Sequence, residues 1–152
     1  MKLLCDEMLQ GLGRWLRVAG YDTAVAEGGS ADEVLLRLAA AERRILLTCD
    51  RGLDQTAAGP VSVLVLATER LDPAAAEVRS RLGVDWLHRP FTRCLRCNVL
   101  LRPALDREVA GLPEDTRRSI GPFTACPGCG RIYWPGSHVR RMRARLERWR
   151  GA

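Results

Sequence analysis

The sequence has no long uninterrupted apolar run, and this absence limits where the protein is expected to work. The chain reaches Asp6 and Glu7 after only two leucines, so no signal-peptide core is predicted. Further along, no apolar stretch has the length that a bilayer-spanning helix needs. We therefore expect a cytoplasmic protein with no membrane partner, in a compartment that keeps cysteine thiols reduced.

The sequence also has almost no lysine, and this excludes one class of α/β protein that carries clustered acids. Lys2 is the only lysine among the 24 lysine and arginine residues. A phospho-accepting receiver domain needs a lysine after its last strand as well as acids such as Asp6 and Asp50. A haloacid-dehalogenase-type phosphatase needs a second Asp two positions after Asp6, where this chain has Met8. Neither class fits.

Long apolar runs are scarce between about residues 89 and 137, so this segment has little with which to build a core. Segments of fewer than about 50 residues usually need a covalent or metal staple. Two C-x-x-C pairs offer one: Cys94 with Cys97, and Cys126 with Cys129. Each pair forms a turn that points both sulfurs at one place, and two such turns create the tetrahedral thiolate set that structural zinc prefers.

Two alternatives to zinc use the same four cysteines. Two disulfides would need an oxidising compartment, for which the sequence gives no sign. Rubredoxin-like iron is a second alternative, because a tetrathiolate site accepts either metal. We predict structural zinc, and its four protein ligands leave no open coordination position for catalysis.

Charge is distributed unequally between the two halves of the chain. Residues 1–87 contain 10 basic and 13 acidic side chains, whereas residues 88–152 contain 14 basic and 5 acidic ones. A bias toward arginine codons would explain arginine in place of lysine, but it would not explain this segregation. An acidic half joined to a basic half suggests a catalytic or metal-binding part next to a part that binds a polyanion.

Short apolar strands alternate with helical patterns in the first half. Strands are predicted at residues 2–5, 22–26, 44–48 and 61–67, with helices at about 8–19, 30–39 and 72–82. We expect Ser30 and Glu33 to form a capping box, and Asp72 to cap the third helix. The alternation predicts an α/β fold with a parallel sheet covered on both faces. It divides the chain into residues 1–88 and a zinc ribbon with a basic C-terminal helix at 89–152.

Three acids are placed by this layout at one edge of the sheet. Asp6 follows the first strand, Asp50 follows the third, and Asp32 begins the helix after the second. Carboxylates gathered at the carboxyl ends of strands repel one another unless a cation compensates. Hard oxygen ligands suit Mg²⁺ or Mn²⁺, which activate water, so the pattern predicts a catalytic site for phosphodiester hydrolysis.

Each acid also has a structural interpretation. Asp6 could cap the helix that follows it, Asp50 could start a turn, and Asp32 could favour the positive end of its helix. If the acids do only this, the chain is a non-catalytic adaptor that binds a polyanion such as RNA and carries a structural zinc ribbon.

Arginines on two helices are candidate phosphate contacts. Arg14 and Arg17 lie three positions apart on the first helix, away from its apolar stripe. In the C-terminal helix, Arg141, Arg145 and Arg148 are expected to face outward and bind RNA. An apolar stripe on that helix is expected to pack on the body of the protein; its members are Val139, Met142, Leu146 and Trp149. A merely solvated helix face is the alternative in both places.

Several motifs occur together and in order along the chain. They are DEML at residues 6–9, RWLR at 14–17, GYDT at 20–23, ILLTCDR at 45–51, the two cysteine pairs, and YWPGSH at 133–138. In this combination the chain resembles the Mut-seven C-terminal RNase domain family, PIN-like ribonuclease domains that carry a C-terminal zinc ribbon. The resemblance implies a PIN-like three-layer fold and a metal-dependent endoribonuclease with RNA as its partner. It places Asp6, Asp32 and Asp50 as the catalytic acids, and Asp54 is the nearest candidate for a fourth.

Overall fold

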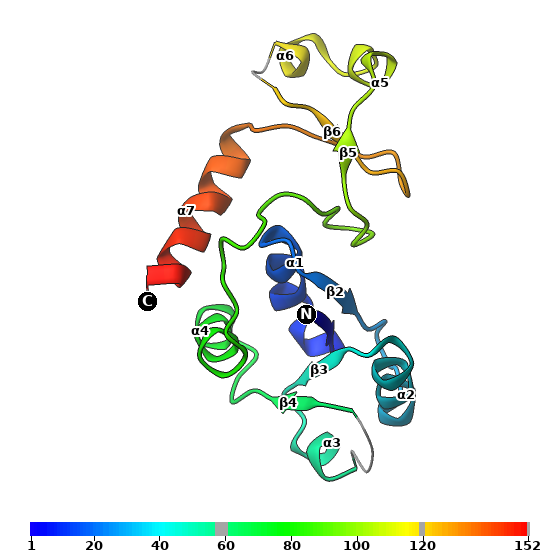
Figure 1. The fold of residues 1–152 in the computed structure, drawn as a ribbon, viewed down its shortest axis with the longest axis vertical. Coiled ribbons are helices and arrows are strands. Elements are labelled where there is room, and N and C mark those ends of the chain that lie inside the picture. Colours follow the sequence, from blue (N-terminus) through cyan, green and yellow to red (C-terminus); the bar gives the residue numbers. More distant parts are fainter. Residues whose placement is uncertain (57–60, 119–120, 152) are drawn as a thin grey trace.

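The centre of the protein is a four-stranded parallel sheet in the order β2-β1-β3-β4 (Figure 1). The computed structural model describes residues 1–56, 61–118 and 121–151, apart from the side chains of residues 54–56. The strands are β1 (Lys2–Cys5), β2 (Asp22–Val25), β3 (Ile45–Thr48) and β4 (Val63–Val65). The predicted α/β fold with a parallel sheet is confirmed.

Both faces of the sheet are buried, and successive residues of the central strands contribute to opposite faces. Leu3, Cys5 and Leu47 belong to one buried apolar cluster. Leu4 and Leu46 belong to the other. Because no face of these strands meets water, their sequences are apolar without the alternation typical of a half-exposed sheet.

Helices cover the two faces and complete three layers. The first face is covered by η1 (Glu7–Leu9), α1 (Gln10–Val18), α4 (Leu71–Leu82) and α7 (Ser137–Gly151). The second face is covered by α2 (Asp32–Glu42) and α3 (Arg51–Thr56). In the part of the chain that the structure describes, none of these helices has the length and apolarity to cross a membrane.

The direction in which successive strands are added to the sheet reverses between β1 and β3. These two strands are neighbours, with Cys5 opposite Leu47 at their carboxyl ends. The chain leaves β1 toward α1 on the first face and leaves β3 toward α3 on the second. Connections that depart to opposite faces make this a topological switch point, the place at which open α/β sheets generally bind their ligands.

A second, smaller sheet lies in the zinc-ribbon segment. Its order is β5-β6-β7 and its strands are antiparallel: β5 (Arg102–Pro103), β6 (Thr124–Ala125) and β7 (Ile132–Tyr133). Two short helices, α5 (Asp106–Ala110) and α6 (Glu114–Arg117), connect β5 to β6. Figure 1 shows this ribbon at one end of the molecule, joined to the parallel sheet by the chain after α4 and by α7.

Helix α7 returns from the ribbon to the core of the first segment. Leu146 is fully buried and Trp149 nearly so, as expected for the apolar stripe of this helix. The Trp149 ring lies 5.0 Å from that of Trp15 and 4.7 Å from that of Trp86, measured between centroids. A helix that the sequence grouped with residues 89–152 therefore completes the core of residues 1–88.

The predicted capping box at the start of α2 is wrong. The N-cap residue is Ala31, which has no side chain able to accept a hydrogen bond. The Ser30 hydroxyl instead donates to the carbonyl oxygen of Glu27 at 2.8 Å. Glu33 pairs with Arg37 one turn along the helix, at 3.6 Å. The serine thus closes the preceding turn and is not available for the helix.

The predicted cap of α4 is also wrong. The helix begins at Leu71, one residue before Asp72, and its N-cap is Arg70. The Asp72 carboxylate accepts hydrogen bonds from Arg145 at 2.7 Å and from the Trp149 indole at 2.9 Å. The Asp72 carboxylate therefore bonds to two N–H donors of α7 and not to the backbone N–H groups of α4. Only the tertiary structure could show this.

Candidate functional site

The four cysteines lie in two turns that have the same backbone design. In the first, Asn98 follows Cys97 and donates its N–H to the Cys94 carbonyl at 2.9 Å. In the second, Gly130 donates its N–H to the Cys126 carbonyl, also at 2.9 Å. Asn98 has φ 63° and Gly130 has φ 70°. Glycine and asparagine are the residues that adopt this left-handed conformation at least cost, so each turn carries its closing residue in the sequence.

The sulfur positions fit one tetrahedral ion. All four sulfur atoms lie within 4.8 Å of one another. The Cys94 and Cys129 sulfurs are 3.7 Å apart, and tetrahedral Zn–S bonds of about 2.3 Å would separate sulfurs by roughly 3.8 Å. All six cysteines are free thiols, so the two-disulfide alternative does not fit. The four cysteines could hold a metal ion such as zinc.

Hydrogen bonds prepare Cys94 to act as a thiolate ligand. Burial acts to raise its pKa, but the Tyr133 hydroxyl at 3.2 Å and the Cys97 N–H at 3.3 Å stabilise the anion. The net effect lowers the pKa of Cys94. Since the thiolate is the form that binds metals, these hydrogen bonds favour coordination by this cysteine.

Asp6 lies at the carboxyl end of β1 and is only 9% exposed. Its Oδ1 atom accepts the Glu7 N–H at 2.6 Å, which caps η1. Its Oδ2 atom accepts the Thr48 hydroxyl at 2.8 Å. The capping interpretation of Asp6 is therefore correct, and its second oxygen also bonds to Thr48 of the neighbouring strand β3.

Asp50 lies two residues beyond the end of β3 and its side chain is exposed. Its N–H donates to the Thr48 hydroxyl oxygen at 3.0 Å, and its Oδ1 accepts the Gly52 N–H at 2.7 Å. The second contact is the turn expected as the alternative role. The buried Thr48 hydroxyl thus links the Asp6 carboxylate to the backbone of Asp50. Both residues follow β1 and β3, the two strands between which the strand order reverses.

The third predicted acid is not part of this link. Asp32 is exposed in the first turn of α2, which follows the edge strand β2. Among the residues that the structure describes, the four cysteines form the only group of three or more potential ligands gathered closely enough to share an ion. The side chain of Asp54, the nearest candidate for a fourth acid, lies outside the described residues.

Two acids near the same edge were missed. Glu7 accepts the Gly29 N–H at 2.5 Å, which fixes the loop between β2 and α2. Glu69 follows β4, and its charge acts together with that of Asp6 on Cys49, whose pKa is raised first by burial and then by these carboxylates. The signal for Glu69 was available in the sequence, because it follows the fourth predicted strand as Asp50 follows the third.

Arg17 does not face solvent as expected from the helical pattern. It is 9% exposed, and burial lowers the pKa of its guanidinium. Its Nε donates to the Thr23 carbonyl at 2.7 Å, and its Nη1 donates to the carbonyls of Leu95 at 2.9 Å and Arg96 at 3.0 Å. Arg17 therefore ties the first cysteine turn to β2, whereas Arg14 is exposed.

The three arginines predicted on α7 have different surroundings. Arg145 pairs with Asp72 at 2.7 Å, and its guanidinium lies 4.9 Å from the centroid of the Trp149 ring. Arg141 and Arg148 are exposed. Arg145 thus has a structural role, and the other two are placed as the sequence predicts.

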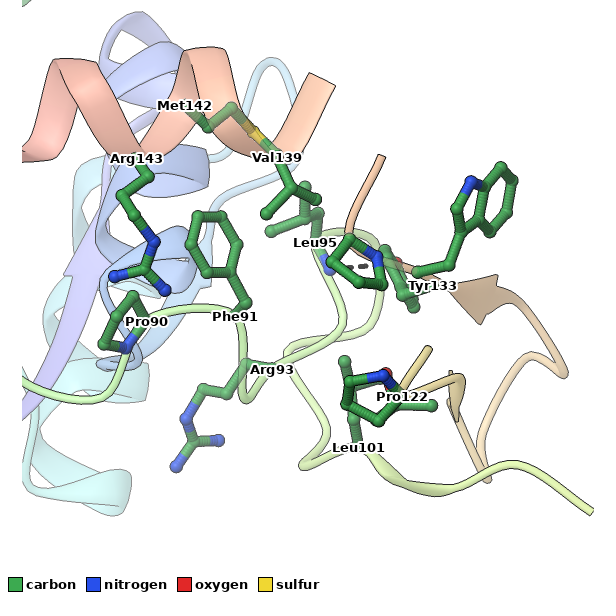
Figure 2. A pocket seen from close by; sticks show the side chains of 13 residues that line it. Pro90, Phe91, Arg93, Leu95, Leu101, Pro122, Tyr133, Val139, Met142 and Arg143 are labelled. Carbon is green, nitrogen blue, oxygen red and sulfur yellow. Dashed lines mark hydrogen bonds between the residues drawn. The ribbon is translucent and has the colours of Figure 1, made fainter. Parts of the chain in front are cut away.

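Figure 2 shows a mostly apolar pocket of about 320 Å³ between α7 and the ribbon. Val139 and Met142 of α7 line one side of it, and Leu101 and Pro122 of the ribbon line another. The Phe91 ring reaches into the same region with the Arg143 guanidinium 5.3 Å from its centroid. This pocket has no acid in its lining, so it is distinct from the edge that carries Asp6 and Asp50.

Comparison with known families gives one match. A family model described as the Mut7-C RNAse domain matches residues 1–146 of the 152-residue chain. No curated protein and no solved structure matches the chain.

Proposed function

Because the chain belongs to the Mut7-C RNAse domain family, we propose that it is a metal-dependent endoribonuclease acting at the carboxyl ends of β1 and β3. The observation that carries this proposal is the Thr48 bridge, which connects the Asp6 carboxylate to the backbone N–H of Asp50 at the switch point where open α/β sheets generally bind ligands. RNA is the expected substrate, as the family description implies.

Each residue at this edge has a defined task. The Thr48 hydroxyl donates to Asp6 and accepts from the Asp50 N–H, so it fixes the Asp6 rotamer and the backbone of Asp50. Asp6 and Asp50 would hold Mg²⁺ or Mn²⁺, and a bound ion would supply Lewis acidity and an activated water. The cysteine cluster would hold zinc with all four positions filled, so it acts as scaffold.

Replacing the two linked acids tests the proposal. We expect Asp50→Asn and Asp6→Asn each to lower RNA cleavage at least ~100-fold, because several kcal/mol of ion-supplied stabilisation is lost. Asparagine caps a helix about as well as aspartate, so the folded state should be retained. Glu33→Gln is the matched control, since Glu33 is an exposed acid paired with Arg37. Parent-level cleavage by both variants with Mg²⁺ present would contradict the assignment.

One observation favours a second function. Asp6 caps η1 and Asp50 closes a turn, so both acids have structural work that needs no ion. A non-catalytic RNA-binding adaptor would use them in this way only. Titration of the protein with Mn²⁺, read by the relaxation of solvent water, separates the two functions. An adaptor should bind RNA yet give no Mn²⁺ site that Asp50→Asn removes.

A further inference from the structure

A basic pocket of about 450 Å³ lies between α1 and the first cysteine turn. Four of its seven lining residues are arginines and none is acidic; the lining consists of Gln10, Arg14, Arg17, Val25, Leu95, Arg96 and Arg131. We call it the arginine pocket. Like charges that share a concave surface repel one another unless an anion is bound between them.

One end of the arginine pocket lies close to the edge of the parallel sheet that carries Asp6 and Asp50. We call this edge the acidic edge. Val25 ends β2 and pairs with Cys5, the residue directly before Asp6. Gln10 begins α1, one turn of chain after Asp6. From there the pocket follows Arg14 along α1 and reaches the ribbon. An extended strand that leaves Asp6 past Gln10 would therefore meet the arginines of this pocket, beginning with Arg14.

The other end is formed by the cysteine turns. Arg96 lies between Cys94 and Cys97, and Arg131 follows the second turn directly after Gly130. The backbone N–H of Cys126 donates to the Arg131 carbonyl at 2.9 Å, so the position of Arg131 depends on the fold of the second turn. Two of the arginines are thus positioned by the same turns that gather the four sulfurs.

The arginines of the pocket are not equivalent. Arg17 is committed to three backbone carbonyls and acts as a fixed positive charge. Arg14, Arg96 and Arg131 are exposed, and none of the ion pairs found within the described residues includes them. Three guanidinium groups therefore remain for a ligand that carries several negative charges.

We infer that the arginine pocket binds backbone phosphates of the RNA strand whose scissile bond lies at Asp6 and Asp50. The planar guanidinium presents paired N–H donors that match phosphate oxygens. The inference rests on the proposed function, since it assigns the path of the substrate away from the same edge. It gives the ribbon a second task, because the metal-organised turns supply Arg96 and Arg131 to the substrate.

The test is a triple variant in which Arg14, Arg96 and Arg131 are each replaced by Gln, with Arg17 kept because it is structural. Affinity for a short single-stranded oligouridylate is measured across a salt series without added Mg²⁺ or Mn²⁺. At ~0.7 per phosphate contact on single strands, the slope of log affinity against log salt should fall by roughly 2. An unchanged slope would overturn the inference.

A matched control removes the same charge elsewhere. Arg37, Arg70 and Arg118 are exposed and lie outside the pocket. Replacing all three by Gln should change the salt slope by less than the ~0.7 expected for one phosphate contact. An equal fall in both triples would show that only net charge matters, and this would also overturn the inference. Zinc content and thermal unfolding of both variants confirm that each remains folded.

Cleavage assays keep this inference separate from the proposed function. If the parent protein binds RNA through the arginine pocket but does not cut it with Mg²⁺ or Mn²⁺, the inference stands and the nuclease proposal fails. If the parent cuts RNA and the triple variant binds and cuts equally well, the nuclease proposal stands and the inference fails. Displacement of the RNA by polyglutamate at equal charge concentration would identify an acidic peptide as the ligand and overturn it as well.

Discussion

The cysteine cluster and the acidic edge are encoded in the chain in different ways. Each C-x-x-C turn contains its own closing residue, Asn98 or Gly130, and the four sulfurs lie within 4.8 Å of one another. The acids depend on which strands become neighbours. Asp6 and Asp50 follow the adjacent strands β1 and β3, whereas Asp32 follows the edge strand β2. A site built from local turns can be located from the spacing of its residues in the sequence. A site that depends on which strands are neighbours cannot be located in this way.

Electrostatics adds to this difference. Thiols can gather without an ion because they share protons and accept N–H and O–H donors, as Cys94 does from Cys97 and Tyr133. Ionised carboxylates repel one another at short range. At the acidic edge a neutral hydroxyl, that of Thr48, stands between Asp6 and the backbone of Asp50. The two sites should therefore respond differently to mutation.

The largest effect is expected for Cys97→Ser. Structural zinc contributes about 10–16 kcal/mol of folding free energy in small zinc peptides, and serine is a poor replacement for a thiolate ligand. The variant should lose its one bound zinc, and amide exchange should become fast in the ribbon while the β1–β4 sheet stays protected. Cys49→Ser is the control, because Cys49 lies outside the cluster and should leave the zinc in place. A ribbon that stays protected in Cys97→Ser, or iron in the purified parent, would contradict the prediction.

Arg17→Met should have the next largest effect, because Arg17 ties the first cysteine turn to β2 of the parallel sheet. The change removes three hydrogen bonds from a charged donor, and each such bond contributes about 1.5–3 kcal/mol. We expect the free energy of unfolding in urea to fall by at least about 3 kcal/mol. Arg14→Met is the control one turn earlier on α1, and an exposed arginine should cost no more than about 0.5 kcal/mol. If both variants lose the same free energy of unfolding, the buried hydrogen bonds of Arg17 do not stabilise the protein.

Thr48→Val sharpens the comparison at the acidic edge. The Asp50 N–H and one oxygen of Asp6 lose their partner, which costs about 1–3 kcal/mol in stability. Cleavage should fall further, by about 10²-fold if the acids shift by about 1 Å. Thr23→Val is the control, because it removes a buried hydroxyl that donates to the Tyr21 carbonyl and not to a predicted acid. The bridge has no catalytic importance if both valine variants cleave RNA at the same rate.

The smallest effects are expected on α7. Replacing Arg141 and Arg148 by Gln should lower the salt slope of RNA binding by roughly 1.4, at ~0.7 for each phosphate contact. Arg145→Gln should instead lower stability by about 1 kcal/mol, because Arg145 pairs with Asp72 and lies over the Trp149 ring. A slope that does not change in the double variant would show that RNA does not touch this helix.

Much of the fold could be predicted from periodicity. The strands at Lys2–Cys5 and Asp22–Val25 and the buried side of α7 follow from short apolar runs and from helical spacing. The two-residue strands of the ribbon could not be predicted, since a segment of that length has no period to detect. The start of α4 was misjudged because the partners of Asp72 lie on α7.

The candidate site divides in the same way. Spacing identified the four cysteines, which the structure brings together. Strand ends identified Asp6 and Asp50, but the buried Thr48 hydroxyl between them could not be anticipated from an apolar strand. Arg17 was taken for a surface residue because helical spacing reports which side of a helix is apolar and not what lies opposite it. Two of its three partners are backbone carbonyls 78 and 79 residues away in the chain.

The return of α7 to the first segment has a consequence for biosynthesis. Trp149 packs between Trp15 and Trp86, so the hydrophobic core of the N-terminal layers stays incomplete while a ribosome is still translating the ribbon. The ribbon, whose four cysteines could hold a metal ion such as zinc, is translated before α7 can close that core. A cell short of zinc would then hold nascent chains with an open tryptophan cluster, and such surfaces recruit chaperones and proteases. Zinc supply would in this way set how much of the protein reaches its folded state.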